Sequence, residues 1–193
     1  MSIKRTHDPA GKRQAILVAA ADLFVQQGYE RTSIAEIAKR ADVAVGSVYR
    51  QFPDKVAILS ALHVDLEYEL ISVMENAWNT DRPYQDRFRP MFAALFSALT
   101  ERHAIMPILT LTKELVGQKT YVPGKAMIDA IRDMYQAGVA TGELRAYPPE
   151  FMPSILHGMV NGGLNAWNEH PTPENEQAVV AILTDAVLAI ARL

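Results

Sequence analysis

The chain of 193 residues contains no cysteine. Disulfide bonds and thiolate metal sites are therefore excluded, and the composition suits a reducing cytoplasm. Long apolar runs are also missing. The stretch from Ile16 to Phe24 has helical spacing and is too short and too amphipathic for a signal sequence or a membrane span. We therefore expect a soluble protein in the cytoplasm.

Motifs for catalysis are missing as well. The sequence has no His-Glu-x-x-His pattern and no glycine-rich phosphate loop. Its five histidines and its carboxylates are scattered without the spacing of a metal site or an acid–base pair. We therefore expect no enzyme activity, no catalytic residue, no bound metal and no cofactor.

The charge is uneven along the chain. A hydrophobic content of 49% with 8% aromatic residues is typical of a globular protein, and the net charge is −3. Residues 1–55 carry nine Lys and Arg against six Asp and Glu, a balance of +3, which leaves −6 for the remainder. A basic end on an acidic body suits a protein of which only one end approaches DNA, and it argues against a non-specific nucleoid protein.

Two short helices joined by a tight turn are predicted between Thr32 and Lys55. Thr32 and Ser33 are both good N-cap residues, and Ser33 and Glu36 have the spacing of a capping box. Apolar residues at helical spacing follow, and then Asp42 suits the left-handed conformation that ends a helix. This pattern is typical of a helix-turn-helix.

The second short helix is expected at residues 45–52, with Val48 and Phe52 on its inner side. Small or polar residues are left for the outer side: Gly46, Ser47, Tyr49, Arg50 and Gln51. Glycine early in a helix costs about 1 kcal/mol relative to alanine. Gly46 therefore indicates either close approach to a phosphate backbone or a short helix that tolerates the cost.

Pro53 is expected to end this helix and to begin the next one, since proline suits the first helical turn. Lys55 falls in that turn, where free backbone N–H groups and the helix dipole favour an anion. Lys55 is therefore either a phosphate contact or a solvated charge.

Residues 13–59 resemble the DNA-binding domain of the TetR family of one-component transcriptional regulators. The matching features have the family's order and spacing: Ile16, Leu17, Ala19, Ala20, Leu23, Phe24, Gly28, Tyr29, Thr32, Ser33, Ile37, Ala38, Gly46, Tyr49, Phe52 and Lys55. The resemblance implies phosphate contacts by Thr32 or Ser33, Tyr49 and Lys55. It implies base contacts by the helix that runs from Val45 to Arg50 and includes Gly46 and Ser47.

Two residues depart from the family pattern. Ala44 stands where the family usually has a serine that caps the second helix, and Val45 stands where a polar or basic residue is common. Val45 offers only an apolar contact, for instance to a thymine methyl group. Arg50 is then the best candidate for a hydrogen-bonded base contact, bidentate to a guanine, although it could equally reach a phosphate.

The rest of the chain predicts further helices and no strands, so the fold class is all-α. A first helix is expected at residues 9–27 and a long connecting helix at 54–78. Later helices are expected at residues 85–101, 104–117, 124–140, 149–168 and 173–192. We place a helix-turn-helix DNA-binding domain at residues 1–55 and an effector-binding and dimerisation domain at residues 56–193.

The middle helices are rich in large, soft side chains, which suit a pocket for an apolar ligand. Each of them could instead be ordinary core. The candidate ligand-binding residues are Trp78, Phe88, Phe92, Phe96, Met106, Met127, Met134 and Tyr135, with His157 and Asn161 as polar anchors.

The last two helices are expected to form the surface of a homodimer through a four-helix bundle, as the resemblance also implies. The alternative is that their apolar stripe packs internally. Taken together, the sequence predicts a ligand-responsive regulator that binds a palindromic DNA operator as a homodimer and is released by a small, largely apolar effector. Repression is the default, as the resemblance implies. The alternative is an all-α ligand carrier or enzyme whose N-terminal segment binds protein.

Overall fold

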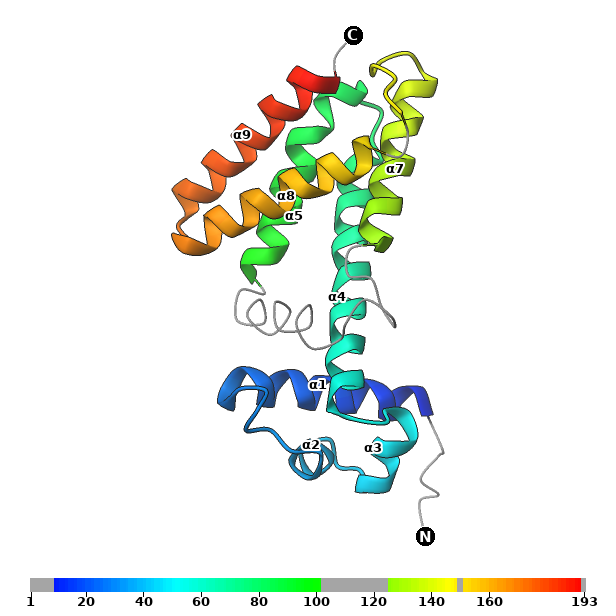
Figure 1. Cartoon of the computed structure of the whole chain (residues 1–193), viewed down its shortest axis with the longest axis vertical. Helices are drawn as coiled ribbons and strands as arrows, with labels where there is room; N and C mark the ends of the chain where they lie inside the picture. Colours follow the sequence, from blue (N-terminus) through cyan, green and yellow to red (C-terminus); the bar gives the residue numbers. More distant parts are fainter. Residues whose placement is uncertain (1–8, 102–124, 149–150, 192–193) are drawn as a thin grey trace. The chain divides into compact units, whose positions relative to one another are not determined.

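A computed structural model of the chain describes residues 9–101, 125–148 and 151–191. Every regular element in these ranges is a helix (Figure 1), so the predicted all-α fold is confirmed. The described residues form two compact units, whose boundary falls inside one long helix between Asp65 and Leu66. We call residues 9–65 the N-terminal unit and the remaining described residues the C-terminal unit. The functional division between residues 55 and 56 stays a prediction.

The N-terminal unit consists of three helices and the start of a fourth. Their bounds are α1 Pro9–Gln27, α2 Ile34–Arg40, α3 Val45–Gln51 and α4 Lys55–Trp78, the last continuing into the C-terminal unit. Helices α1, α2 and α3 each contact the other two. Since α2 and α3 have seven residues each, they would not persist alone in water and depend on this packing.

The core of the N-terminal unit is contributed by all four helices. Its side chains are almost fully buried, and the most deeply buried of them are Ile16, Leu17, Ala20, Phe24, Ile37, Ala38, Val48, Ile58 and Leu59. Burial of each Val, Leu, Ile or Phe side chain contributes about 1.5–3 kcal/mol. Val48 at 0% exposed and Phe52 at 4% confirm the predicted inner side of the second short helix.

Two left-handed residues shape the turns between these helices. Gly28, with φ +86°, ends α1, and its N–H donates to the Phe24 carbonyl at 3.0 Å. Asp42, with φ 51°, ends the turn after α2, as its residue type predicted. A short polar side chain tolerates this conformation better than a bulkier one does.

The start of α4 differs from the expectation. Helix α4 begins at Lys55, and the carboxylate of Asp54 accepts a hydrogen bond from the Ala57 N–H at 2.7 Å. Asp54 is thus the N-cap, because it satisfies a free N–H group of the first turn. The prediction that Pro53 begins the helix was wrong; Pro53 lies in the bend before the cap.

The C-terminal unit contains the second part of α4 and four further helices, with one short 3-10 turn. Their bounds are η1 Tyr84–Asp86, α5 Phe88–Glu101, α7 Lys125–Ala140, α8 Met152–Glu169 and α9 Pro173–Ala191. The predicted helix at 85–101 is divided into η1 and α5, because Pro90 is tolerated only in the first turn of a helix. The predicted helix at 104–117 lies outside the described residues. None of the helices in the described ranges is long and apolar enough to cross a membrane.

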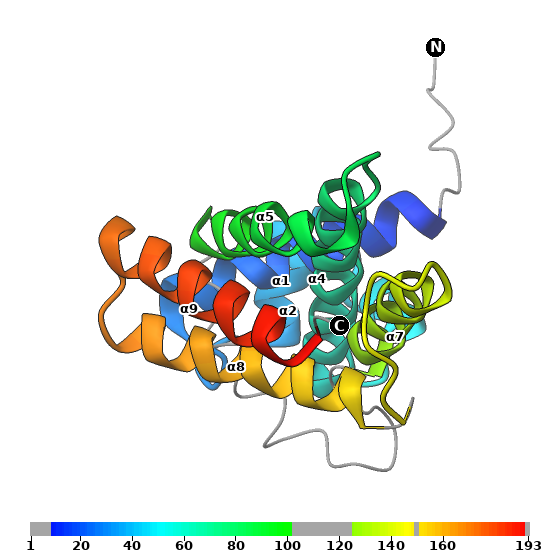
Figure 2. The same ribbon diagram turned by 90° about the horizontal axis from the view of Figure 1, so that it is seen from above.

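Helices α8 and α9 form an antiparallel pair, with α5 against α9 and α7 against α8 (Figures 1 and 2). At Gly163, side chains of α9 pack directly against the backbone of α8. A Cβ atom at this position would lie 2.9 Å from Cγ1 of Val179 and 3.1 Å from Cδ1 of Leu183. Gly163 is therefore required by internal packing, which accounts for one of the three glycines of α8.

Candidate nucleic-acid interface and effector pocket

The N-terminus of α2 carries the predicted capping box. The Glu36 N–H donates to Ser33 Oγ at 3.2 Å, while the Glu36 carboxylate accepts from the Ser33 N–H at 2.8 Å and from its hydroxyl at 2.7 Å. These hydrogen bonds, led by the one from the Ser33 hydroxyl, lower the pKa of Glu36. Ser33 is exposed, whereas Thr32 is 2% exposed and its hydroxyl donates to the Gly28 carbonyl at 2.8 Å. Of these two residues, Ser33 is the one on the surface.

Helix α3 presents a polar and partly apolar outer face. Val45 is 42% exposed and Tyr49 54% exposed, and Gly46 and Arg50 are also on the surface. The Arg50 guanidinium lies along the helix, 3.4 Å from the Gly46 carbonyl and 3.5 Å from the half-buried Ser47 Oγ. These long contacts leave the guanidinium largely available to a base or a phosphate.

The first turn of α3 has no side-chain cap, because Ala44 stands at the N-cap position. A Cβ atom at Gly46 would meet no heavy atom of this chain within 4 Å. The protein's own packing therefore gives no reason for glycine at this position. A partner that approaches the backbone from outside would give one.

Lys55 is bound inside the N-terminal unit. Its Nζ donates to the Tyr29 carbonyl at 2.7 Å, to the Thr32 carbonyl at 2.9 Å and, more weakly, to the Glu30 carbonyl at 3.4 Å. The same ammonium lies 4.2 Å from the centre of the Tyr29 ring. An ammonium has three N–H donors, so all of its hydrogen-bonding capacity is directed at the turn between α1 and α2.

The phenol of Tyr29 shares this environment. Burial is the first cause of its raised pKa, and the carboxylates of Glu30 and Asp54 raise it further. Tyr29 therefore stays neutral over the physiological range. Its ring also packs against Phe24, with 5.2 Å between ring centres.

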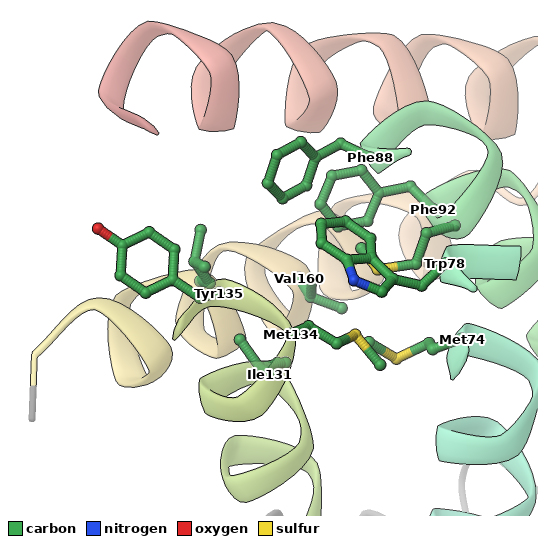
Figure 3. Close-up of a pocket in the computed structure, with 10 residues that line it drawn as sticks. Met74, Trp78, Phe88, Phe92, Ile131, Met134, Tyr135 and Val160 are labelled. Atoms are coloured by element: carbon green, nitrogen blue, oxygen red, sulfur yellow. The ribbon is translucent and has the colours of Figure 1, made fainter. Parts of the chain in front are cut away.

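A small cavity lies in the C-terminal unit between α4, α5, α7 and α8 (Figure 3). Ten side chains line it: Met74, Trp78, Phe88, Met91, Phe92, Ile131, Met134, Tyr135, Leu156 and Val160. Its wall is apolar throughout. About 20 Å³ is open to the centre of a water-sized sphere, which is room for roughly one water molecule.

Aromatic rings make up one side of the cavity. Trp78 and Phe88 meet edge to face, with 4.9 Å between ring centres and an angle of 70°. Tyr135 contributes its ring only, because its hydroxyl points away from the cavity and donates to the Arg145 carbonyl (Figure 3). Burial raises the pKa of Tyr135. The wall therefore offers aromatic and thioether surface and no charge.

Five of the candidate ligand-binding residues line this cavity: Trp78, Phe88, Phe92, Met134 and Tyr135. Phe96 and Met127 are buried away from the cavity, at 0% and 9% exposed. His157 and Asn161 are not among the lining residues either. On α8 the Asn161 amide donates to the His157 carbonyl at 3.0 Å. Met106 lies outside the described residues.

The candidate ligand-binding residues leave out half of the residues that line the cavity: Met74, Met91, Ile131, Leu156 and Val160. Met74 belongs to the apolar stripe of α4, and Ile131 precedes Met134 by one helical turn. These spacings mark a buried face, and the spacing alone does not say which buried residues border a void.

The outer side of α8 and α9 exposes small and apolar residues. Ile155 is 47% exposed and Ile182 66% exposed, and a Cβ atom at Gly158 or Gly162 would meet nothing within 4 Å. In the parts of the chain that the structure covers, no group of three or more His, Asp or Glu side chains is placed to hold a metal ion.

This chain is similar to a family of bacterial regulatory proteins and to relatives that are transcriptional regulators. Residues 16–62 match the family described as bacterial regulatory proteins, tetR family. The chain is 32% identical over 186 residues to the HTH-type transcriptional regulator AcrR of Shigella flexneri, a match that covers 86% of this chain and 83% of AcrR. It is 28% identical over 182 residues to the HTH-type transcriptional repressor BepR of Brucella suis, covering 86% of this chain and 85% of BepR.

Solved structures show the same fold. FadR from Bacillus subtilis in complex with stearoyl-CoA aligns with a TM-score of 0.71 over 91% of this chain and 97% of that one. The sequence identity is 18%, so this likeness concerns the fold alone.

Proposed function

This chain belongs to the TetR family of bacterial regulatory proteins, and from that premise we propose that it represses transcription by binding an operator as a homodimer and that a small apolar molecule releases it. The family consists of transcriptional regulators, which disfavours an enzyme or a carrier whose N-terminal unit binds protein. The observation that carries the proposal is the outer face of α3, which has no packing role in the N-terminal unit.

DNA binding by α3 is supported by the division of its residues into a buried side and an exposed side. Val48 is fully buried, so α3 is fixed on the core, while Tyr49 and Arg50 extend outward on the opposite side. We assign base reading to Arg50 with help from Ser47, and an apolar contact to Val45. Ser33 and Tyr49 are proposed to contact phosphates, which fix the orientation of the helix in the major groove.

Dimerisation through α8 and α9 is supported by their exposed outer side. Ile155 and Ile182 are large apolar residues on the surface, and the glycines at positions 158 and 162 allow close approach of another helix. Two copies related by a two-fold axis would form a four-helix bundle. Such a dimer reads a palindrome with half-sites about one helical turn apart.

The effector is proposed to bind in the cavity between α4, α5, α7 and α8 as a neutral, aromatic or alicyclic molecule. The FadR structure contains stearoyl-CoA, which has an acyl chain and a highly charged head group. The described cavity wall of this chain provides no charged partner for such a head group. An uncharged ligand that packs on Trp78 and Phe88 suits the wall best.

Selection of bound DNA from a random library, followed by fluorescence anisotropy, tests DNA reading. Arg50→Ala should relax the preference at one base pair of each half-site, with a loss of about 1–3 kcal/mol of discrimination there. Arg31→Ala is the matched control, because Arg31 is also exposed but donates to the Gln27 carbonyl at 2.6 Å at the end of α1. If wild type selects no sequence, or if Arg50→Ala keeps the same preference, the assignment of α3 fails.

A further inference from the structure

One buried carboxylate lies on the same face of α4 as the cavity. Glu67 is 6% exposed and precedes two other buried residues of this stripe, Met74 at 1% and Trp78 at 4%. The spacing of seven and eleven residues places all three on one side of the helix. Met74 and Trp78 line the cavity, and Glu67 lies two turns below Met74, about 10 Å along the helix axis.

Glu67 reaches across to α7. Its Oε1 accepts a hydrogen bond from the backbone N–H of Met127 at 3.0 Å, and the contact is buried. Met127 is the third residue of α7, where backbone N–H groups have no partner inside the helix. A carboxylate at this position satisfies one such group and also interacts favourably with the helix dipole.

Helix α7 runs in the same direction as the second part of α4, beside it (Figures 1 and 2). Its buried face continues from Met127 to Ile131 and Met134, which line the other side of the cavity. In Figure 3 the side chains of Met74 and Met134 point toward each other. The Glu67–Met127 hydrogen bond and the cavity therefore belong to the same pair of helices, about two turns apart.

The cavity has to expand before it accepts a ligand. It holds about 20 Å³ in this structure, whereas an apolar cavity that binds benzene measures about 150 Å³. Helices α4 and α7 contribute half of its lining residues. A ligand between Met74 and Met134 pushes these helices apart, and an increase of about 0.5 Å already takes a 3.0 Å hydrogen bond to the limit of its range.

We propose that Glu67 is a positioning residue of the effector response. Its hydrogen bond to the Met127 amide holds α7 against α4 in the ligand-free form that binds DNA, and a ligand that opens the cavity breaks it. This inference rests on the proposed function of the cavity as the effector site. Because the hydrogen bond favours the closed form, its removal favours the open form: ligand affinity rises and operator affinity falls.

The test uses the full-length protein and the neutral dye N-phenyl-1-naphthylamine as the probe. Dye binding is followed by fluorescence, and operator binding by anisotropy with and without saturating dye. Glu67→Ala should bind the dye between roughly tenfold and a hundredfold more tightly, the range expected for a hydrogen bond to a charged group. Glu67→Gln keeps an oxygen acceptor and should give a smaller increase. Both variants should bind the operator more weakly than wild type without dye.

Glu75→Gln is the matched control, because Glu75 is an exposed carboxylate on the same helix. It should match wild type in both titrations. A merely structural role of Glu67 would lower the melting temperature of Glu67→Gln and leave its dye affinity unchanged, and this result overturns the proposal. Hydrogen exchange on wild type needs no variant: the dye should accelerate exchange at the first turn of α7, and unchanged or slower exchange there also contradicts the proposal.

Val160→Phe, which fills the cavity, separates this inference from the proposed function. If the dye releases wild type from DNA and Val160→Phe blocks that release, the result supports the cavity as the effector site. The Glu67 variants then test the role of Glu67 separately. If the dye binds wild type without any effect on DNA, or binds Val160→Phe equally well, the proposed effector site fails and the role of Glu67 fails with it.

Discussion

At the residue scale, Lys55 joins segments that are distant along the chain. Its ammonium binds the carbonyls of Tyr29, Glu30 and Thr32, which lie 23 to 26 positions earlier. The turn between α1 and α2 thus has its carbonyl groups satisfied by the first residue of α4. A phosphate contact by Lys55 would require it to give up at least one of these carbonyls, so the geometry favours the structural role.

Lys55→Met should therefore lower the free energy of unfolding, by about 1–3 kcal/mol for the lost charge-assisted hydrogen bonds and the contact with the Tyr29 ring. Thermal unfolding measures this loss. Lys39→Met, which removes an exposed lysine of α2, should cost less.

DNA binding of Lys55→Met, measured well below its melting temperature, separates the two roles of Lys55. We expect the dependence of log affinity on log salt concentration to match that of wild type. A slope shallower by about 0.9 would instead show that one phosphate contact was lost, and that Lys55 binds DNA.

The sequence predicts the conformation and partners of some residues and not of others. The Ser33–Glu36 capping box and the left-handed Asp42 depend on positions a few residues apart, so local chemistry determines them. The partners of Lys55 and of Glu67 are set by packing between distant helices, which one sequence does not specify. Glu67 did carry a signal: a charged residue within the apolar stripe of α4.

At the element scale, α2 and α3 have equal lengths and unequal N-termini. Helix α2 has a reciprocal capping box, whereas the N-cap of α3 is Ala44, which provides no side-chain cap, and the second residue of α3 is a glycine. Both features of α3 weaken a helix in isolation. The helix that reads DNA in our proposal is thus the less stable of the two, and its order depends on the burial of Val48.

Gly46→Ala tests whether that weakness serves DNA binding. The new methyl group meets no atom of the chain within 4 Å, so the substitution should stabilise the protein by about 0.5–1 kcal/mol through helix propensity. If the DNA backbone approaches Gly46 closely, operator affinity should fall at the same time. Thermal unfolding and anisotropy on the same sample compare the two effects, and operator binding equal to that of wild type would contradict the close approach.

Elements as a whole were predicted well where apolar periodicity and end signals agree. The expected first helix at residues 9–27 coincides with α1, and the expected last helix at 173–192 begins at the same residue as α9 and agrees with it to Ala191, where the described residues end. The predicted start of this helix, at residue 85, was wrong for α5, which begins at Phe88. Pro90 has to lie in the first turn of a helix, and this requirement outweighs the helical pattern of the residues before Phe88. Only the packing of four helices decides which buried side chains border the cavity, and Phe96 and Met127 fall outside its wall for that reason.

At the scale of the whole molecule, our proposal makes the dimer the state that recognises an operator. Ile182→Glu introduces a charge at the centre of the exposed apolar side of α9, where it would be buried without a partner in a dimer. We expect a monomer in analytical ultracentrifugation and, because one half-site alone binds weakly, a loss of specific operator binding. Tyr68→Glu, at a side chain that is 62% exposed on α4, should stay dimeric. If Ile182→Glu remains dimeric, the dimer interface does not include this side of α9.

In the proposed effector site, the small volume of the cavity also affects the speed of a response. A site that holds about one water molecule leaves an arriving effector no room until the wall opens. The rate of association then reaches a ceiling as effector concentration rises, and this ceiling equals the opening rate of the protein itself. Effectors of different size and affinity would share that ceiling and differ in how long they stay bound. The time that the regulator needs to sense a molecule would then be a property of its own helices.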